Sequence, residues 1–189
     1  MNDKNNEIKT KETRRKRVWK GFNFLEQEEV RVISEEKIKS ILFHRGHFLL
    51  INEVLITSEE MIGKVRITED MCLGHIMPNG KMVLKGSDFL DMAAQFLGIW
   101  IAQWPQLRSS LEGKICMPVE YGKSRFKISA IMGDLVSIRL NPRNVQARER
   151  TNYTLITGKN FTIKIEEKQK ENMVSSVKLM AFNAESLAE

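Results

Sequence analysis

The sequence predicts an α+β domain in which one long helix is buried in the curve of an antiparallel sheet. Two features support this prediction: an apolar segment at 86–104, and several β-branched runs separated by turn residues. The chain has 189 residues, of which 42% are apolar and 29% charged. This composition is typical of a globular protein, and the length suits one domain.

A short amphipathic helix is expected at 34–46. Ser34 is a suitable N-cap, Glu35 and Glu36 would occupy the first turn, and Gly46 would end the helix. The helix would place its apolar side chains on one face and pack them against the sheet.

Strands are expected before and after the long helix. The runs at 47–57 and 61–68 are β-branched and apolar, which predicts two antiparallel strands, and the turn-rich stretch at 74–82 predicts a loop. A bulge is expected at Gly158-Lys159. Four further segments are predicted to contain strands: 114–126, 134–140, 153–167 and 173–182.

The helix predicted at 86–104 is apolar nearly all round, and Pro105 would end it. Such a helix either spans a membrane or is surrounded by protein. Four polar side chains interrupt the run: Asp88, Asp91, Gln95 and Gln103. Because one carboxylate at mid-membrane depth costs about 2.5–3.5 kcal/mol, burial within the protein is the better interpretation.

Asp91 and His75 are the candidate catalytic residues. Asp91 would lie near the start of the buried helix, where a carboxylate is costly unless it is paired or hydrogen-bonded. Asp88 is the more natural cap, which leaves Asp91 available for function, although a structural ion pair is the alternative. A loop histidine is more often structural, but one that meets a carboxyl at a helix N-terminus would combine a base, an acid and an oxyanion site.

The net charge of +6 lies almost entirely at the N-terminus. The first 20 residues contain eight basic and three acidic side chains, so the remainder of the chain carries only +1. We therefore expect a basic, mostly disordered extension at 1–30 and a folded domain at 31–189. A nearly neutral domain does not argue for nucleic-acid binding.

Four segments resemble, in the same order, motifs of the FabZ-type 3-hydroxyacyl-[acyl-carrier-protein] dehydratases. HRGHFLLINEVL at 44–55 is similar to HRxPFLLVDRV, and CLGHIMP at 72–78 is similar to FxGHFP. GSDFLDMAAQFLG at 86–98 resembles GxLxLEAMAQxxG, and the segment 119–140 resembles IDxxRFKxPVxPGDxLxxxV. The resemblance implies the hotdog fold, a long helix wrapped by a curved antiparallel sheet, usually as a dimer with a continuous sheet.

The resemblance also implies an activity, the reversible removal of water from a (3R)-3-hydroxyacyl thioester to give the trans-2-enoyl product. His75 stands at the family's catalytic histidine and would take the proton alpha to the carbonyl. Asp91 stands at the catalytic carboxylate, which is Glu in FabZ-type and Asp in FabA-type enzymes. It would reach the site from the partner subunit and protonate the leaving hydroxyl. The Gly86 N–H would hold the enolate-like oxygen, and Gln95 stands at the glutamine one turn beyond the acid. No metal or redox cofactor is implied.

The expected partners are an acyl carrier protein or coenzyme A thioester and further copies of the chain that share active sites. We expect neither nucleic-acid binding nor membrane insertion. The N-terminus lacks a signal-type apolar segment, and Cys72 and Cys116 are too few for a disulfide scaffold, so a cytoplasmic location is expected. Two alternatives share the fold: a non-catalytic protein that binds acyl chains or scaffolds a partner, and an acyl thioesterase.

The sequence departs from the family motifs near the catalytic pair. Lys85 replaces the usual proline before Gly86, and Asn79-Gly80 looks like an inserted turn between the histidine and the acid. His47 replaces the proline of the first motif. We interpret His44, the histidine of that motif, as a structural residue at the corner between helix and strand.

Overall fold

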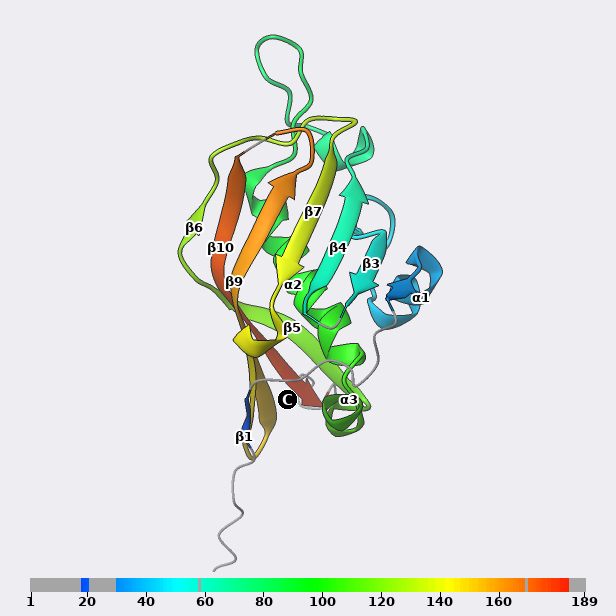
Figure 1. Cartoon of the computed structure of the whole chain (residues 1–189), viewed down its shortest axis with the longest axis vertical. Helices are drawn as coiled ribbons and strands as arrows, with labels where there is room; N and C mark the ends of the chain where they lie inside the picture. Colours follow the sequence, from blue (N-terminus) through cyan, green and yellow to red (C-terminus); the bar gives the residue numbers. More distant parts are fainter. Residues whose placement is uncertain (1–17, 21–29, 58, 169, 184–189) are drawn as a thin grey trace, which may run out of the picture.

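The computed structural model describes residues 18–20, 30–57, 59–168 and 170–183. Within them, ten strands form one antiparallel sheet, and the long helix α2 (Gly86–Ala102) runs behind it (Figure 1). The predicted fold class is therefore confirmed. No helix of the described residues combines the length and apolar character needed to cross a membrane.

Two long strands, β9 (Tyr153–Ile165) and β10 (Glu171–Asn183), form the centre of the sheet and pair along nearly their full length. From β9 the sheet continues through four shorter strands: β7 (Leu135–Leu140), β4 (Met61–Arg66), β3 (Glu53–Ile56) and β2 (Arg31–Ile33). Two strands pair with the other edge of β10: β5 (Lys114–Tyr121) and β6 (Ser124–Arg125). Two more extend one end of β9: β8 (Val145–Glu149) and then β1 (Val18–Lys20).

The helix α1 (Glu35–Ile41) begins as predicted, because the side chain of Ser34 accepts a hydrogen bond from the Lys37 N–H. Its predicted end at Gly46 is wrong. Gly46 has a φ of +57° and opens a short 3₁₀ turn at Gly46–Phe48, so the chain has already left the helix.

Four strands and helices were not predicted: β1, β2, α3 (Pro105–Leu111) and β8. Pro105 occupies the first turn of α3, a position that proline tolerates because its missing N–H has no partner there. The strand β8 has only two apolar residues, Val145 and Ala147, and both are buried, so its alternation was too short to predict a strand without the pairing to β9.

Next to the expected bulge at Gly158-Lys159, β9 is irregular at Asn160. Lys159 pairs with Ser176 and Phe161 with Val174, while Asn160 between them has a φ of +59° and the alternation of buried residues shifts there. Because Ser175 of β10 is skipped as well, the register of the two strands is the same on both sides.

The core forms between α2 and the sheet. From Met92 to Ile101 every residue of α2 except Gly98 is buried, and each buried Phe, Leu or Ile contributes about 1.5–3 kcal/mol. A Cβ at Gly63 of β4 would lie 2.9 Å from the Phe96 ring. Glycine at this position therefore allows the sheet to approach the helix closely.

Most of the predicted extension at 1–30 lies outside the described residues. Within it, Val18–Lys20 forms β1 and pairs with β8. The backbone of these three residues pairs with the edge of β8, and the expectation for the remainder of the stretch stays a prediction.

Candidate active site

The start of α2 is capped by its own third residue. The carboxylate of Asp88 accepts a hydrogen bond from the Lys85 N–H at 3.2 Å, as predicted for the cap. The pKa of Asp88 is raised, mainly by burial and slightly by the negative charge of Asp91, while Lys85 opposes the shift. Asp91 therefore takes no part in capping.

Asp91 lies on the open side of α2. Its burial was expected, but in the single chain it is exposed, whereas the next six residues of the helix are buried. The hydroxyl of Tyr121, the last residue of β5, donates a hydrogen bond to Asp91 Oδ1 at 2.9 Å. The second oxygen, Oδ2, has no hydrogen-bond partner among the described residues.

Two neighbouring cavities meet at Asp91. The larger has a volume of about 830 Å³ and follows α2 toward α3, and the smaller has about 400 Å³ and lies beside the start of α2. Both are lined by His44, Asp91 and Gln95. Further along α2 the larger cavity is lined by Gly98 and Ile101, and near α3 by Arg108 and Glu112.

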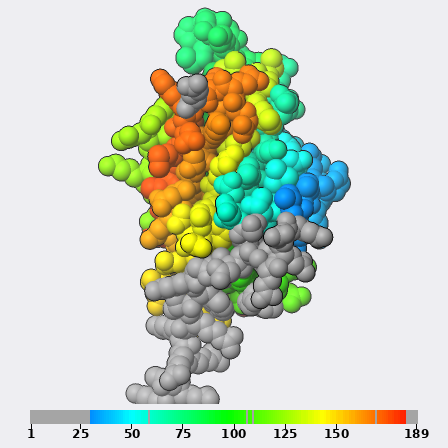
Figure 2. Space-filling view, in the orientation of Figure 1, coloured from blue at the N-terminus to red at the C-terminus, as the bar shows by residue number. Residues whose placement is uncertain are grey.

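His75 lies in a segment that projects from one end of the sheet (Figures 1 and 2). The segment 74–82 turns at Asn79-Gly80, where Gly80 has a φ of +78° and its N–H donates to the Met77 carbonyl at 2.8 Å. The turn predicted at Asn79-Gly80 is thereby confirmed. The His75 ring is exposed, and its Nδ1 lies 3.3 Å from the Val83 carbonyl oxygen. Within the described part of one chain His75 lines neither cavity and makes no hydrogen bond to Asp91.

Gly86 is the first residue of α2, so its N–H has no intrahelical partner and is available to an oxyanion. Phe126 covers this turn: a Cβ at Gly86 would lie 3.5 Å from its ring, which also stacks on Phe89 at a centroid distance of 5.5 Å. The aromatic pair places the first turn of α2 against the segment that follows β6.

Gln95 is 3% exposed and is fully engaged by the backbone. Its Oε1 accepts from the Leu50 N–H at 2.9 Å, and its Nε2 donates to the Phe48 carbonyl at 2.7 Å. Gln95 therefore joins α2 to the segment that precedes β3, and its contacts to a substrate are limited to the surface it presents in the two cavities.

His44 is the site residue whose role the sequence did not indicate. Its half-buried ring lines both cavities, and its Nδ1 is buried with no hydrogen-bond partner among the described residues. The pKa of His44 is lowered, mainly by burial and also by Arg45, while the negative charge of Asp91 opposes the shift. The only signal in the sequence was its place in the first motif.

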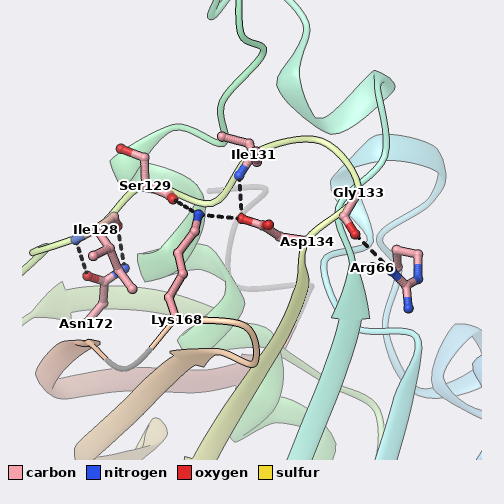
Figure 3. A network of polar contacts seen from close by, with 8 residues as sticks. All are labelled: Arg66, Ile128, Ser129, Ile131, Gly133, Asp134, Lys168 and Asn172. Carbon is pink, nitrogen blue, oxygen red and sulfur yellow. Dashed lines mark hydrogen bonds and ion pairs between the residues drawn. The ribbon is translucent and has the colours of Figure 1, made fainter.

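A buried polar network supports the segment that leads into α2 (Figure 3). The side chain of Asn172 accepts from the Lys127 and Ile128 N–H groups, and Asp134 Oδ2 accepts from the Ile131 N–H at 2.9 Å. The segment 127–132, which these bonds hold, pairs with the backbone of residues 82–84: the Leu84 N–H donates to the Ala130 carbonyl, and the Met132 N–H donates to the Met82 carbonyl. The network therefore fixes the backbone between the His75 segment and Gly86.

The described residues contain no group of three or more His, Cys, Asp or Glu side chains placed to hold a metal ion. Cys72 and Cys116 are free, and burial raises the pKa of both thiols. Both cysteines are therefore protonated at neutral pH and poor nucleophiles.

Comparison with known proteins places the chain in a family. A scan against models of protein families finds no match. The chain is 29% identical over 139 residues to the 3-hydroxyacyl-[acyl-carrier-protein] dehydratase FabZ of Haemophilus influenzae strain PittEE, spanning 71% of this chain and 87% of that protein. It is 32% identical over 112 residues to the protein of the same name from Wolinella succinogenes, spanning 56% of this chain and 73% of that protein.

A solved structure shares the architecture. The match is to a chain of the dehydratase heterocomplex ApeI:P from Xenorhabdus doucetiae, with a TM-score of 0.54 and 16% sequence identity. It covers 80% of this chain and 94% of that chain. The shared architecture, a long helix enclosed by an antiparallel sheet, is the hotdog fold. The sequence matches, including the one at 32% identity that spans 73% of its relative, show that the chain belongs to the FabZ family of 3-hydroxyacyl-[acyl-carrier-protein] dehydratases.

Proposed function

We propose that the protein catalyses the reversible dehydration of (3R)-3-hydroxyacyl thioesters to trans-2-enoyl thioesters, with acyl carrier protein as the thiol carrier. One observation carries this proposal: in a chain of the FabZ family, the carboxylate of Asp91 stands at the mouth of a largely apolar cavity beside the first turns of α2. A carboxyl at the end of an apolar channel suits the 3-hydroxyl group of a bound acyl chain.

His75 is the proposed base. The contact of its Nδ1 with the Val83 carbonyl favours the tautomer protonated at Nδ1, so Nε2 is free to take the proton from C2. Asp91 is the proposed acid, and it protonates the leaving 3-hydroxyl from Oδ2, so water departs as the C2–C3 double bond forms. The Gly86 N–H donates to the thioester oxygen as negative charge develops there.

A dimer with shared sites would bring the two catalytic residues together. The outer edge of β5 has no strand partner among the described residues, and Met117 and Val119 on this strand are 42% and 48% exposed. An open edge with exposed apolar side chains suits pairing with a second copy across a two-fold axis. In this arrangement His75 of one subunit would face Asp91 of the other.

The acyl chain would occupy the larger cavity. Ala94, Gly98 and Ile101 lie one turn apart along α2 and line it, and the small side chains of the first two leave space beside the helix. The chain would extend from Asp91 toward α3.

An acidic carrier protein would dock next to the start of α2. Lys123, Arg125 and Lys127 are exposed on either side of Phe126, which covers Gly86. Arg143 and Arg148 lie instead near β8, at the end of the sheet where β1 pairs (Figure 1). The basic rim beside the active site is therefore formed by the 123–127 group.

The test is hydration of crotonyl thioester, followed by the loss of enoyl absorbance. The wild-type protein should turn over, and His75→Ala and Asp91→Asn should each lower kcat by about 100-fold or more while the variants remain folded. Lys81→Ala, an exposed position in the same projecting segment, is the matched control and should retain full turnover. Acyl binding without turnover would support a non-catalytic protein, and release of free thiol without hydration would support a thioesterase.

A further inference from the structure

A bulge in β5 turns Tyr121 toward the active site. Tyr121 pairs with Val177 and Glu120 with Lys178, but the next pair is Pro118 with Leu179, so Val119 is an extra residue in β5. Side chains alternate between the two faces of a strand, and one extra residue reverses the alternation beyond it. Tyr121 therefore shares a face with Pro118, which lines the larger cavity.

The residue after Tyr121 holds this end of β5 close to β10. The Gly122 N–H donates to the Ser176 carbonyl at 2.8 Å, and a Cβ at Gly122 would collide with the side chains of Ser175 and Ser176. The motif IDxxRF has Ile-Asp where this chain has Tyr121-Gly122. Tyr121, and Gly122, which allows β5 to lie close to β10 next to it, are therefore features of this chain and not of the motif.

The hydrogen bond defines which oxygen of Asp91 can give up a proton. Burial, and then the contact with Asp91 and its negative charge, raise the pKa of the Tyr121 phenol, so the phenol remains a neutral donor. Since Oδ1 accepts from the phenol, the proton of the neutral acid lies on Oδ2. When Asp91 has given that proton to the leaving hydroxyl, the bond from Tyr121 becomes charge-assisted and stronger.

We propose that Tyr121 is a positioning residue for the dehydration, which orients Asp91 so that Oδ2 faces the substrate and stabilises the carboxylate formed by proton transfer. This inference rests on the proposed function. Because the charged hydrogen bond forms only as the proton is transferred, its loss lowers kcat and leaves substrate binding nearly unchanged.

The test compares Tyr121→Phe with Tyr153→Phe in the dehydration direction, with (3R)-3-hydroxybutyryl thioester as substrate and the gain of enoyl absorbance as the readout. The chain has two tyrosines, and Tyr153, in β9, makes no side-chain hydrogen bond within the described residues, so the same chemical change is made with and without a partner. We expect Tyr121→Phe to lower kcat by about 10- to 100-fold with KM within about twofold, and Tyr153→Phe to have no effect. In an Asp91→Asn background Tyr121→Phe should cause no further loss.

The outcomes separate this inference from the proposed function. If the wild-type protein turns over and Tyr121→Phe changes kcat by less than about twofold, or changes only KM, the role of Tyr121 is overturned and the proposed function stands. Absence of wild-type turnover overturns the proposed function and this role with it. Thermal melting checks the fold of each variant, and Tyr121→Met, which keeps apolar bulk, is expected to show the same loss of kcat if Tyr121→Phe does not fold.

Discussion

Lys168 Nζ lies 2.8 Å from Asp134 Oδ2, which joins the turn between β9 and β10 to the turn that precedes β7 (Figure 3). Asp134 is 6% exposed, and the same amine also donates to the Ser129 carbonyl at 2.9 Å. One ion pair thus holds the 129–134 segment, which in turn pairs with the backbone that leads into Gly86.

Removal of the amine should destabilise the protein. Lys168→Met leaves the buried carboxylate of Asp134 without its cation, and we expect the free energy of unfolding to fall by about 1–2 kcal/mol, discounted because Lys168 is one-third exposed. In the double variant with Asp134→Asn the loss should be smaller than the sum of the single losses. Urea denaturation measures these values, with Lys170→Met, an exposed neighbour, as control. Additive losses would contradict the coupling.

Gly86 allows a test of its N–H alone. Proline is favoured at the first position of a helix, and Lys85 has φ −68° and ψ 149°, a conformation that tolerates a following proline. An alanine Cβ would make only an ordinary contact, 3.5 Å from the Phe126 ring. Both variants should therefore fold, but Gly86→Pro removes the N–H and should lower kcat by about 100- to 1,000-fold, while Gly86→Ala retains most activity. Similar rates for the two variants would exclude the N–H as an oxyanion donor.

His44 should make stability depend on pH. Burial holds the pKa of folded His44 below its ordinary value of 6.5, so the unfolded chain binds the proton more tightly. The resulting contribution to stability is present above about pH 6.5 and is lost as the pH falls through 6.5 toward the lower folded pKa. The free energy of unfolding should therefore fall more between about pH 7.5 and 5.5 in the wild type than in His44→Gln, as urea titrations would show. Equal falls would mean that the proton binds equally in both states.

Local pattern was sufficient for most of the fold. The cap at Ser34, the apolar periodicity of α2 and the alternation of the strands each depend on neighbouring residues, so they could be predicted without knowing the tertiary contacts. The prediction missed the second use of a proline and misplaced the end of a helix at a glycine. Pro105 begins α3 and Gly46 opens a 3₁₀ turn, because both residues fit several backbone conformations and only the packing around them selects one.

By itself the sequence determined that α2 is buried, that Asp88 is its cap, and that His75, Gly86 and Asp91 lie in motifs of the FabZ family. Only the tertiary structure decided which groups surround Asp91. The register of β5 against β10 brings Tyr121 to it across 30 residues of chain, and the turn after α1 brings His44 to the same cavities. Strand register and the packing of helices on strands are set by the sum of long-range contacts, which the sequence around one residue does not contain. The backbone conformation of a residue therefore follows from its neighbours in sequence, whereas the partners of its side chain follow from the fold.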